Sequence, residues 1–267
     1  MTTAREPQEL AVPAHSGGRS ALVIGGATGL GAAVAKALGN RGEAVTVADL
    51  VAPEGDPGCA SERVDVRDPA AVDRLVRTVT DREGRIDTLV YAAGLLDGYA
   101  GIDGTDDRLL NAVMDVNAAG AVRACRAVAP VMRHASHGRI VLIASIAGQV
   151  AGAGGLAYTM SKHAVIGLVR HLAAELGPDG ITVNAIAPGP ITGTRLRENT
   201  SALLPSHAPD PTRGLGTLGP EQIRDRFPVG RFGDPASVVP VVTMLASAES
   251  WFVNGAVVPI DGGFTAL

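Results

Sequence analysis

The stretch Ala21-Leu22-Val23-Ile24-Gly25-Gly26-Ala27-Thr28-Gly29-Leu30-Gly31 decides the fold class of this 267-residue chain. Its first four residues form a short apolar run, which is typical of a strand buried on both faces. The glycine-rich turn that follows opens a segment in which Leu30, Val34 and Leu38 recur at helical spacing. The stretch therefore predicts a strand, a tight turn and a helix.

The glycines of this turn have a specific use when a phosphate group lies beside it. Glycine at positions 25 and 29 lets backbone N–H groups approach a pyrophosphate, and Gly31 lets the helix pack closely on the strand. The amino end of the helix adds a favourable partial positive charge. The spacing G-x-x-x-G-x-G differs from the commoner dinucleotide fingerprint, so an ordinary glycine-rich turn stays an alternative.

Strand-like and helix-like segments alternate from here to the end of the chain. Strands are expected at 44–48, 63–66, 88–91, 139–144, 181–186 and 256–260, and helices at 69–79, 106–134, 157–176 and 235–248. Such alternation implies right-handed βαβ crossovers. We predict one α/β domain at 19–267, a Rossmann-type doubly wound parallel sheet of about seven strands. Residues 1–18 are expected to be a disordered arm, and the proline-rich insertion near 190–230 a substrate lid.

The composition excludes several classes of protein. Basic residues number 23 and acidic residues 27, so the net charge of −4 argues against nucleic acid and anionic membranes as partners. The two cysteines, Cys59 and Cys125, make neither a disulfide framework nor a metal cluster, and we predict no metal site. No apolar run is long enough for a transmembrane helix, and residues 1–20 lack the apolar region of a secretory signal. We therefore expect a cytoplasmic protein.

An acidic residue closes the second expected strand. Asp49 lies 24 residues after Gly25, where a carboxylate can accept hydrogen bonds from the ribose of a bound adenosine. Taken alone, such a residue is more often a strand-end cap. Together with the glycine turn, it favours a dinucleotide site.

A second group of residues has the chemistry for proton transfer. Tyr158 and Lys162 are four residues apart and share one face of the expected helix, and an ammonium group beside a phenol stabilises its phenolate. Ser145 ends an apolar strand, where open α/β sheets place their sites. Considered separately, Tyr158 and Lys162 could be an ordinary pair on a helix surface, and Ser145 could be a helix or turn cap.

In this order and spacing, the chain resembles the classical short-chain dehydrogenase/reductase family from Arg19 to its end. The resemblance rests on the two groups above and on further short motifs: Asp65-Val66, Ala92-Ala93-Gly94, Val116-Asn117, Ile143-Ala144-Ser145, Gly180-Ile181-Thr182-Val183-Asn184, Ala187-Pro188-Gly189, Gly230-Arg231-Phe232-Gly233 and Asp261-Gly262-Gly263.

The resemblance implies a role for each residue of the catalytic group. Tyr158 would be the general acid or base, and Lys162 would hold the nicotinamide ribose and lower the pKa of Tyr158. Ser145 would hydrogen-bond the reacting oxygen, and Asn117 would hold a water in a proton relay. The implied cofactor-binding residues are Gly25, Thr28, Gly29, Leu30, Asp49, Asp65, Val66, Ala93, Gly94, Tyr158, Lys162, Pro188, Gly189, Ile191, Thr192 and Thr194.

The chain departs from the family pattern at three positions. Ile24 and Ala92 replace a usual threonine and asparagine, and each loses a local hydrogen bond. Gly193 stands where the family often has a threonine, so either Thr192 or Thr194 could contact the carboxamide. None of these changes removes a catalytic group.

The resemblance implies an enzyme that transfers a hydride between a nicotinamide cofactor and a secondary alcohol or ketone. We expect the cofactor to be NAD, because Ala27, Thr28 and Leu50 offer no cation to a 2′-phosphate. The expected substrate is bulky and apolar or cyclic, since the candidate lining residues are mostly apolar: Leu95, Leu96, Ile146, Gln149, Val150, Leu156, Pro190, Leu196, Leu203 and Leu204. In the lid, Arg195 and Arg197 could instead meet an anionic substrate or be solvated.

Two other functions stay open at this point. An epimerase or dehydratase could use the same tyrosine and lysine with retained NAD, although such relatives usually have a larger carboxy-terminal domain. A non-catalytic, NAD-responsive regulator could share the fold. The resemblance also implies a homotetramer built through the long helices and the last strand.

Overall fold

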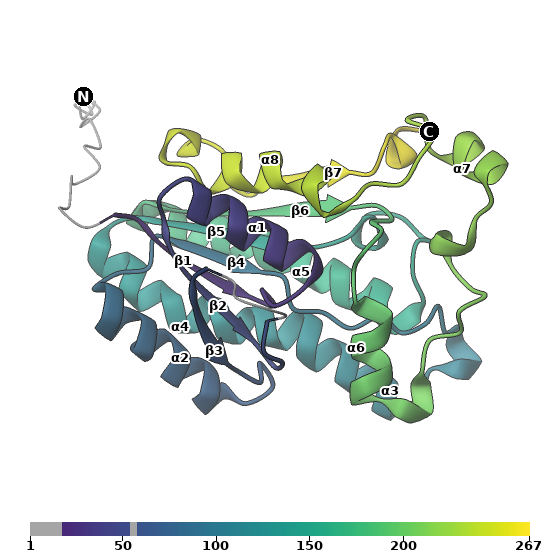
Figure 1. Cartoon of the computed structure of the whole chain (residues 1–267), viewed down its shortest axis with the longest axis horizontal. Coiled ribbons are helices and arrows are strands. Elements are labelled where there is room, and N and C mark those ends of the chain that lie inside the picture. Colours follow the sequence, from purple (N-terminus) through teal and green to yellow (C-terminus); the bar gives the residue numbers. More distant parts are fainter. Residues whose placement is uncertain (1–17, 54–57) are drawn as a thin grey trace, which may run out of the picture.

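The computed structural model describes residues 18–53 and 58–267, so the expected arm at 1–18 lies, apart from Gly18, outside the described residues. At its centre is one parallel sheet in the order β3-β2-β1-β4-β5-β6-β7 (Figure 1). The strands are β1 (Ser20–Ile24), β2 (Ala44–Asp49), β3 (Ala60–Arg63), β4 (Thr88–Tyr91), β5 (Gly138–Ile143), β6 (Ile181–Pro188) and β7 (Val257–Ile260). The predicted Rossmann-type doubly wound sheet is confirmed.

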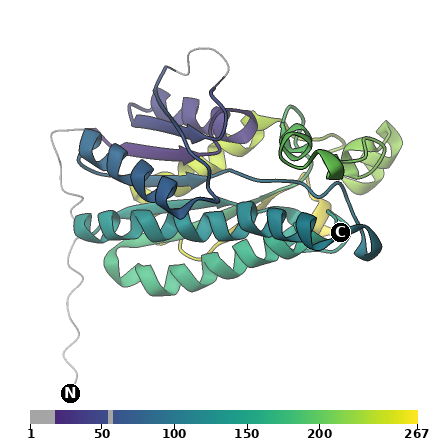
Figure 2. The same ribbon diagram turned by 90° about the horizontal axis from the view of Figure 1, so that it is seen from below.

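Helices cover both faces of this sheet. Those that cover it are α1 (Gly29–Asn40), α2 (Pro69–Glu83), α3 (Asp107–Met114), α4 (Gly120–Ala135), α5 (Leu156–Leu176) and α8 (Pro235–Ala246), whereas α6 (Leu196–Leu203) and α7 (Pro220–Arg226) lie beyond the ends of the strands. Figure 2 shows α2, α4 and α5 together on one side of the sheet, with α1 and α8 on the other. This three-layer arrangement follows from the right-handed crossovers between parallel strands.

The central strands β1, β4, β5 and β6 bury both of their faces, and β2 does so except at its two ends, whereas the edge strands β3 and β7 are only partly buried. In β1, Leu22 and Ile24 pack in the core layer under α2, α4 and α5, whereas Ala21 and Val23 pack in the layer under α1 and α8. The alternation follows from the two-residue period of a strand. The sheet is thereby fixed in one register, which brings the carboxyl ends of its strands to one edge.

Two predicted elements differ from the structure. The third strand lies at Ala60–Arg63 rather than 63–66, because the buried pair Val64 and Val66 belongs to the turn that follows this edge strand. The helix expected at 106–134 is divided by a π-helical turn at Asp115–Ala119. Single π-turns inside helices are frequent at functional sites, and this one contains Asn117.

The insertion expected near 190–230 lies between β6 and α8. It contains α6, α7 and short 3₁₀ turns at Pro205–His207 and Leu215–Thr217. Figure 1 shows these elements beyond the carboxyl ends of the strands, with α7 beside the carboxy terminus and α6 further from it. We call residues 190–230 the lid.

Candidate active site

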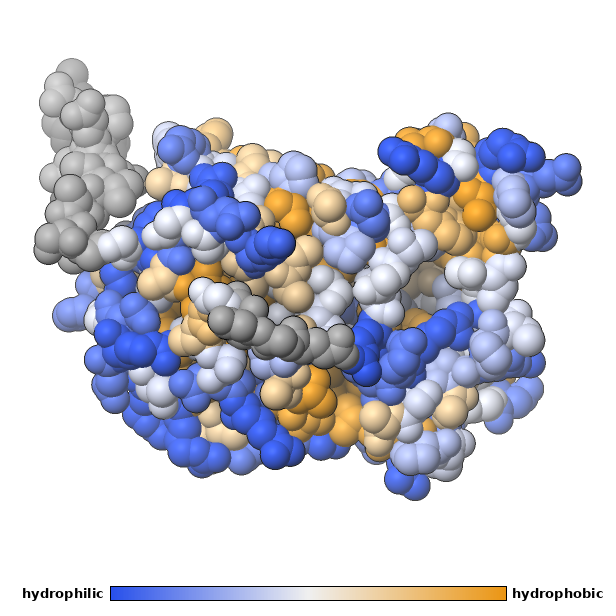
Figure 3. Space-filling model, in the orientation of Figure 1, coloured by the Kyte–Doolittle hydropathy of each residue, from blue (hydrophilic) through white to orange (hydrophobic). Residues whose placement is uncertain are grey.

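A groove of about 440 Å³ runs along the carboxyl edge of the sheet. It is lined by the glycine turn, by residues at the ends of β2 to β6, and by the first part of the lid. Figure 3 shows hydrophobic side chains gathered at the right of this face, where α7 and the carboxy terminus lie. The edge where parallel strands end is the usual place for a ligand in this architecture.

The glycine turn forms a close-fitting wall of the groove. Gly25 has a left-handed φ of 79°, and a Cβ there would overlap the backbone nitrogen of Ala93. A Cβ on Gly31 would overlap the carbonyl oxygen of Gly25. The amino end of α1 faces the groove directly after this turn, so the residues present fit a pyrophosphate. The predicted residues Thr28, Gly29 and Leu30 line the groove here.

The other end of this wall carries charged groups. Asp49 Oδ2 accepts a hydrogen bond from the Ala27 N–H (3.0 Å), which holds the carboxylate beside the turn. Arg67 pairs with Asp65 (2.6 Å), and this hydrogen-bonded guanidinium lowers the pKa of the Asp65 carboxyl. Arg63 lies opposite Asp49 in the β2–β3 register and also lines the groove. Sequence reasoning missed both arginines, because no pattern ties a strand-end cation to a ligand.

Tyr158 and Ser145 meet at the opposite end of the groove. Ser145 follows β5, and its hydroxyl accepts from the Ala147 N–H (3.1 Å). Tyr158 lies in the first turn of α5 and is 8% exposed. Burial raises the pKa of Tyr158 to about 12, although a hydrogen bond with Ser145 acts to lower it. The phenol therefore carries its proton at neutral pH.

Lys162 lies one helical turn further along α5 and is also buried. Its ammonium donates to the carbonyl of Ile143 (2.8 Å) and lies 5.5 Å from the centroid of the Tyr158 ring. Burial lowers the pKa of Lys162 to about 8. The net shift of the Tyr158 pKa is upward because of burial, so the expected lowering of that pKa by Lys162 stays a prediction.

Asn117 connects this catalytic end to the chain that leaves β4. Its Nδ2 donates to the carbonyl of Leu95 (3.0 Å) and to Ser161 Oγ (2.9 Å), and its Oδ1 accepts from the Leu95 N–H (2.7 Å). Asn117 does not line the groove, although Val116 does. Its side chain is thus engaged with protein groups, and a water-holding role stays a prediction.

The structure brings most of the predicted cofactor residues to the groove. Those that line it are Gly25, Thr28, Gly29, Leu30, Asp49, Asp65, Val66, Ala93, Gly94, Tyr158, Lys162, Pro188, Gly189, Ile191 and Thr194. Thr192 does not, because its hydroxyl donates to the Gly233 carbonyl (3.2 Å). Of the two candidate threonines, only Thr194 is therefore placed to contact a ligand.

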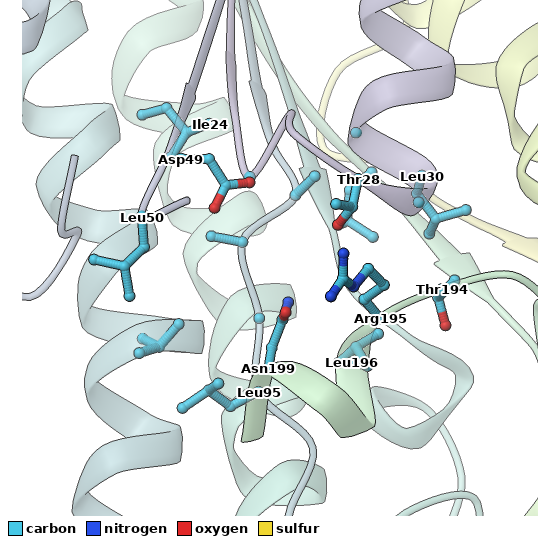
Figure 4. Close-up of a pocket in the computed structure, with 18 of the residues that line it drawn as sticks. Ile24, Thr28, Leu30, Asp49, Leu50, Leu95, Thr194, Arg195, Leu196 and Asn199 are labelled. Atoms are coloured by element: carbon cyan, nitrogen blue, oxygen red, sulfur yellow. The ribbon is translucent and has the colours of Figure 1, made fainter. Parts of the chain in front are cut away.

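Arg195 and Arg197, the two arginines considered for an anionic substrate, have different surroundings. Figure 4 shows Arg195 extending into the pocket beside Thr28 and Asn199. Arg197 instead donates to the carbonyls of Asp210 (2.8 Å) and Arg213 (2.6 Å), which holds the lid together. Only Arg195 therefore matches the hypothesis of a cation that meets an anionic group. Asn199 was missed because nothing in the sequence marks which face of α6 turns inward.

An apolar cluster surrounds the buried side of Tyr158. Its members come from the segments after β4 and β5, the lid and the residue that closely follows it, and the carboxy terminus: Ile146, Ala147, Ala153, Leu215 and Phe227, with Leu96, Val150, Leu196, Leu218, Ile223, Phe232 and Phe264 at its margin. Of the residues predicted to line a substrate pocket, Leu96, Ile146, Val150 and Leu196 belong to this cluster. Leu204 instead joins the main core, and Leu95 and Leu203 line the groove.

Two other features are absent from residues 18–53 and 58–267. No group of three or more His, Cys, Asp or Glu side chains is arranged to hold a metal ion. Over the same residues, no helix combines the length and apolar character needed to span a membrane.

The sequence matches a family model described as enoyl-(acyl carrier protein) reductase over residues 25–265. Oxidoreductase UcpA of Escherichia coli (strain K12) is 33% identical, with 93% of this chain and 95% of UcpA covered. Cyclohexanol dehydrogenase of Rhodococcus sp. (strain TK6) is 32% identical, with 93% and 96% covered. The 3-oxoacyl-[acyl-carrier-protein] reductase MabA of Mycobacterium bovis is 34% identical, with 92% of each chain covered.

Solved structures agree with these relatives. A crystal structure of levodione reductase superposes with a TM-score of 0.80 at 29% identity, covering 93% of this chain and 98% of that one. A structure of ElxO with NADP bound gives a TM-score of 0.81 at 25% identity, covering 94% and 100%.

The close packing of the turn predicts the effect of one methyl group. In Gly31→Ala the new Cβ overlaps the Gly25 carbonyl, so the turn shifts and NADH binding should weaken by at least about tenfold, roughly 1.4 kcal/mol. The control is Gly39→Ala on the same helix, whose Cβ would only touch Val45 at 3.9 Å. Calorimetric titration with NADH measures both. Equal affinity of Gly31→Ala and wild type would contradict the assigned cradle.

Proposed function

Since this chain belongs to the classical short-chain dehydrogenase/reductase family, we propose that it is an NAD-dependent oxidoreductase acting on a secondary alcohol or ketone. The observation that carries the proposal is the meeting of Ser145, Tyr158 and Lys162 at one end of a groove that begins at a glycine turn. A bound nicotinamide supplies the hydride acceptor or donor. The protein supplies orientation and the proton.

Each residue of the catalytic end has a task in this reaction. In the reducing direction, Tyr158 donates its phenolic proton to the carbonyl oxygen, and in the oxidising direction its deprotonated phenolate receives the hydroxyl proton. Ser145 donates a hydrogen bond to the same oxygen and stabilises charge there. Lys162 would turn from the Ile143 carbonyl toward the nicotinamide ribose. Because its pKa is raised, Tyr158 is ready to donate a proton at neutral pH.

The groove wall would hold the rest of the cofactor. Backbone N–H groups at Thr28, Gly29 and Leu30 would face the pyrophosphate, and Asp49 would accept from the adenosine ribose. Asp65 and Val66 would flank the adenine. Gly94 would line the groove. At the nicotinamide end, Pro188 and Gly189 would line the groove, Ile191 would contact the carboxamide through its backbone, and Thr194 would do so through its hydroxyl.

We propose an apolar, bulky or cyclic substrate. The apolar cluster around Tyr158 supports this, because a substrate beside the phenol would displace or contact these side chains. Two similar proteins, named cyclohexanol dehydrogenase and levodione reductase, carry cyclic substrates in their names. MabA is named for an acyl-carrier-protein substrate, so 3-oxoacyl thioesters belong in the same screen.

Turnover of NADH with a panel of ketones tests this function. Cyclohexanone, larger cyclic ketones and a 3-oxoacyl thioester are mixed with wild type and with Tyr158→Phe, and the loss of NADH absorbance is followed. Wild type should consume NADH with at least one apolar ketone, whereas Tyr158→Phe should lose more than about a hundredfold in kcat and still bind NADH.

Two outcomes would count against the proposal. Turnover of Tyr158→Phe within about tenfold of wild type would remove the tyrosine from the proton transfer. NADH that binds wild type and is never consumed would favour the NAD-responsive regulator.

We propose NAD rather than NADP because Asp49 would face the 2′-phosphate of NADP. Like charges about 4 Å apart cost roughly 4 kcal/mol at an effective dielectric of about 20, before screening. The same carboxylate gains charge-assisted hydrogen bonds from ribose hydroxyls, worth about 1.5–3 kcal/mol each. Arg63, on the neighbouring strand, would favour NADP, because its positive charge would attract the 2′-phosphate. One similar structure, ElxO, holds NADP.

Cofactor preference is measured as kcat/KM with NADH and NADPH. Wild type should favour NADH by roughly 100-fold or more, about 2.7 kcal/mol. Asp49→Ala with Leu50→Arg should move the preference toward NADPH, and Arg63→Ala should lower the residual use of NADPH. Equal use of both cofactors by wild type, or an unmoved preference in the double variant, would show that Asp49 does not face the ribose.

We also propose a homotetramer that works in the cytoplasm on small molecules, without nucleic acid or a membrane as partner. Val122 on α4 and Met160 on α5 are 41% and 45% exposed, which leaves apolar side chains on the outer helix layer. Trp251 and Phe252, before β7, are 58% and 85% exposed. The buried free thiol of Cys125 fits a reducing compartment.

Light scattering at micromolar concentration should give the mass of four chains. Val122→Glu with Met160→Glu places charge in the proposed contact and should release smaller species. A monomeric mass of wild type would contradict the assembly.

A further inference from the structure

The segment of residues 95–99, here called the strap, connects three parts of the active site. It begins where the chain leaves β4 after Gly94. At its start, Leu95 exchanges two hydrogen bonds with Asn117 in the π-turn. The remaining residues of the strap contact α5 and the lid. None of these contacts was expected from the sequence.

Asp97, in the middle of the strap, is turned toward α5 and is 3% exposed. Its Oδ2 accepts a hydrogen bond from the Tyr158 N–H (2.9 Å). Its Oδ1 accepts from the Gly155 N–H (3.2 Å) and from the Tyr99 N–H (3.1 Å). A buried carboxylate is thus held by three backbone donors, one of which belongs to the proton-donating tyrosine.

This carboxylate replaces a cap that α5 lacks. The first N–H groups of a helix have no partner inside it and are usually satisfied by a side chain at the N-cap position. The N-cap of α5 is Gly155, which has no side chain. A Cβ there would lie 2.5 Å from both oxygens of Asp97, so glycine is what admits the carboxylate. Asp97 therefore caps the helix from another segment, at the peptide group of Tyr158 itself.

The strap also joins the lid. The Leu96 N–H donates to Thr200 Oγ1 (3.0 Å), and the Thr200 hydroxyl donates to the Leu96 carbonyl (2.8 Å). The Tyr99 hydroxyl accepts from the Leu215 N–H (3.1 Å). Gly214, with φ 97°, lies against the Tyr99 ring where any Cβ would overlap it. The lid thus contacts Leu96 and Tyr99, which lie on either side of Asp97 in the strap.

We propose that Asp97 is a positioning residue, which holds the backbone of Tyr158 and links its placement to the seating of the lid. The proposal rests on the function proposed above, because it concerns the position of the Tyr158 phenol as proton donor. Displacement of the strap would move the amino end of α5, and a misplacement of about 1 Å can cost roughly a hundredfold in rate. A substrate that holds the lid in contact with the strap would therefore also hold the Tyr158 phenol in position.

The charge of Asp97 acts on the Tyr158 phenol, which the carboxylate that caps another helix would not do. The titratable groups that face the Tyr158 phenol are Ser145 beside β5, Lys162 on α5, and Asp97 and Tyr99 on the strap. The apolar cluster supplies the other contacts. Burial is the main reason why the pKa of Tyr158 is raised, and the Asp97 carboxylate adds to the effect. Removing that charge should therefore lower the pKa of Tyr158.

The test is Asp97→Asn, assayed with NADH and the ketone that wild type turns over best. The asparagine side chain has the same shape as aspartate, but its NH₂ group faces a backbone N–H and cannot accept a hydrogen bond from it. We therefore expect kcat to fall by roughly tenfold to a hundredfold. KM for NADH should stay within about twofold, because Asp97 does not line the groove. The alkaline limb of the pH profile should move to lower pH. Asp97→Ser, which adds no volume, should do the same if the asparagine variant does not fold.

The matched control is Asp234→Asn, which alters the carboxylate that caps α8 by accepting from the Ser237 N–H (2.9 Å). It should lower the melting temperature without moving kcat or the pH profile. Equal losses of kcat in the Asp97 and Asp234 variants, or a folded Asp97 variant with unchanged kcat and pH profile, would overturn the proposal.

Hydrogen exchange tests the link to the lid. The amides of Tyr158 and Leu215 should both exchange faster in Asp97→Asn than in wild type. Faster exchange at Tyr158 alone would overturn the coupling between the cap and the lid. If wild type consumes no NADH with any ketone, the proposed function itself is overturned. The role of Asp97 is still tested in that case, because melting and hydrogen exchange of the same samples report on the cap of α5 without any turnover.

Discussion

The close approach between the glycine turn and the end of β4 is the contact on which the rest of the site depends. Because Gly25 has no side chain, the backbone of Ala93 can lie directly against it. The chain then leaves β4 along the groove through Gly94, whose Cβ position is 3.5 Å from Asn117 Oδ1 and 3.9 Å from Lys162 Nζ. One backbone contact thus connects the end of the groove that fits a pyrophosphate with the end that carries Tyr158.

Burial then determines which protonation states are present at the catalytic end. It raises the pKa of Tyr158 to about 12 and lowers that of Lys162 to about 8, so both shifts favour the neutral group. At neutral pH the phenol keeps its proton and the ammonium keeps its charge. A buried phenol beside the Ser145 hydroxyl is suited to give a proton to a carbonyl oxygen, which is the role proposed here for Tyr158.

The sequence predicted the fold and most of the groove for physical reasons that act locally. Apolar runs such as Ala21–Ile24 fix buried strands, and the register of a parallel sheet then brings their ends together. What it could not predict depends on contacts between distant segments. The cap that Asp97 places on α5 and the position of Arg63 opposite Asp49 have no local pattern. Val64 and Val66 led to a misplaced strand, because alternate residues of a turn can be buried in the same way as alternate residues of a strand.

The most direct test of the account is the fate of a labelled hydride. NADH carrying deuterium at the transferable position of nicotinamide C4 is incubated with the protein and an apolar cyclic ketone, and the product is analysed by mass spectrometry. The account predicts an alcohol with one deuterium on the carbinol carbon, formed by wild type and not by Tyr158→Phe. An unlabelled alcohol, or labelled NADH recovered intact with every ketone tried, would contradict it.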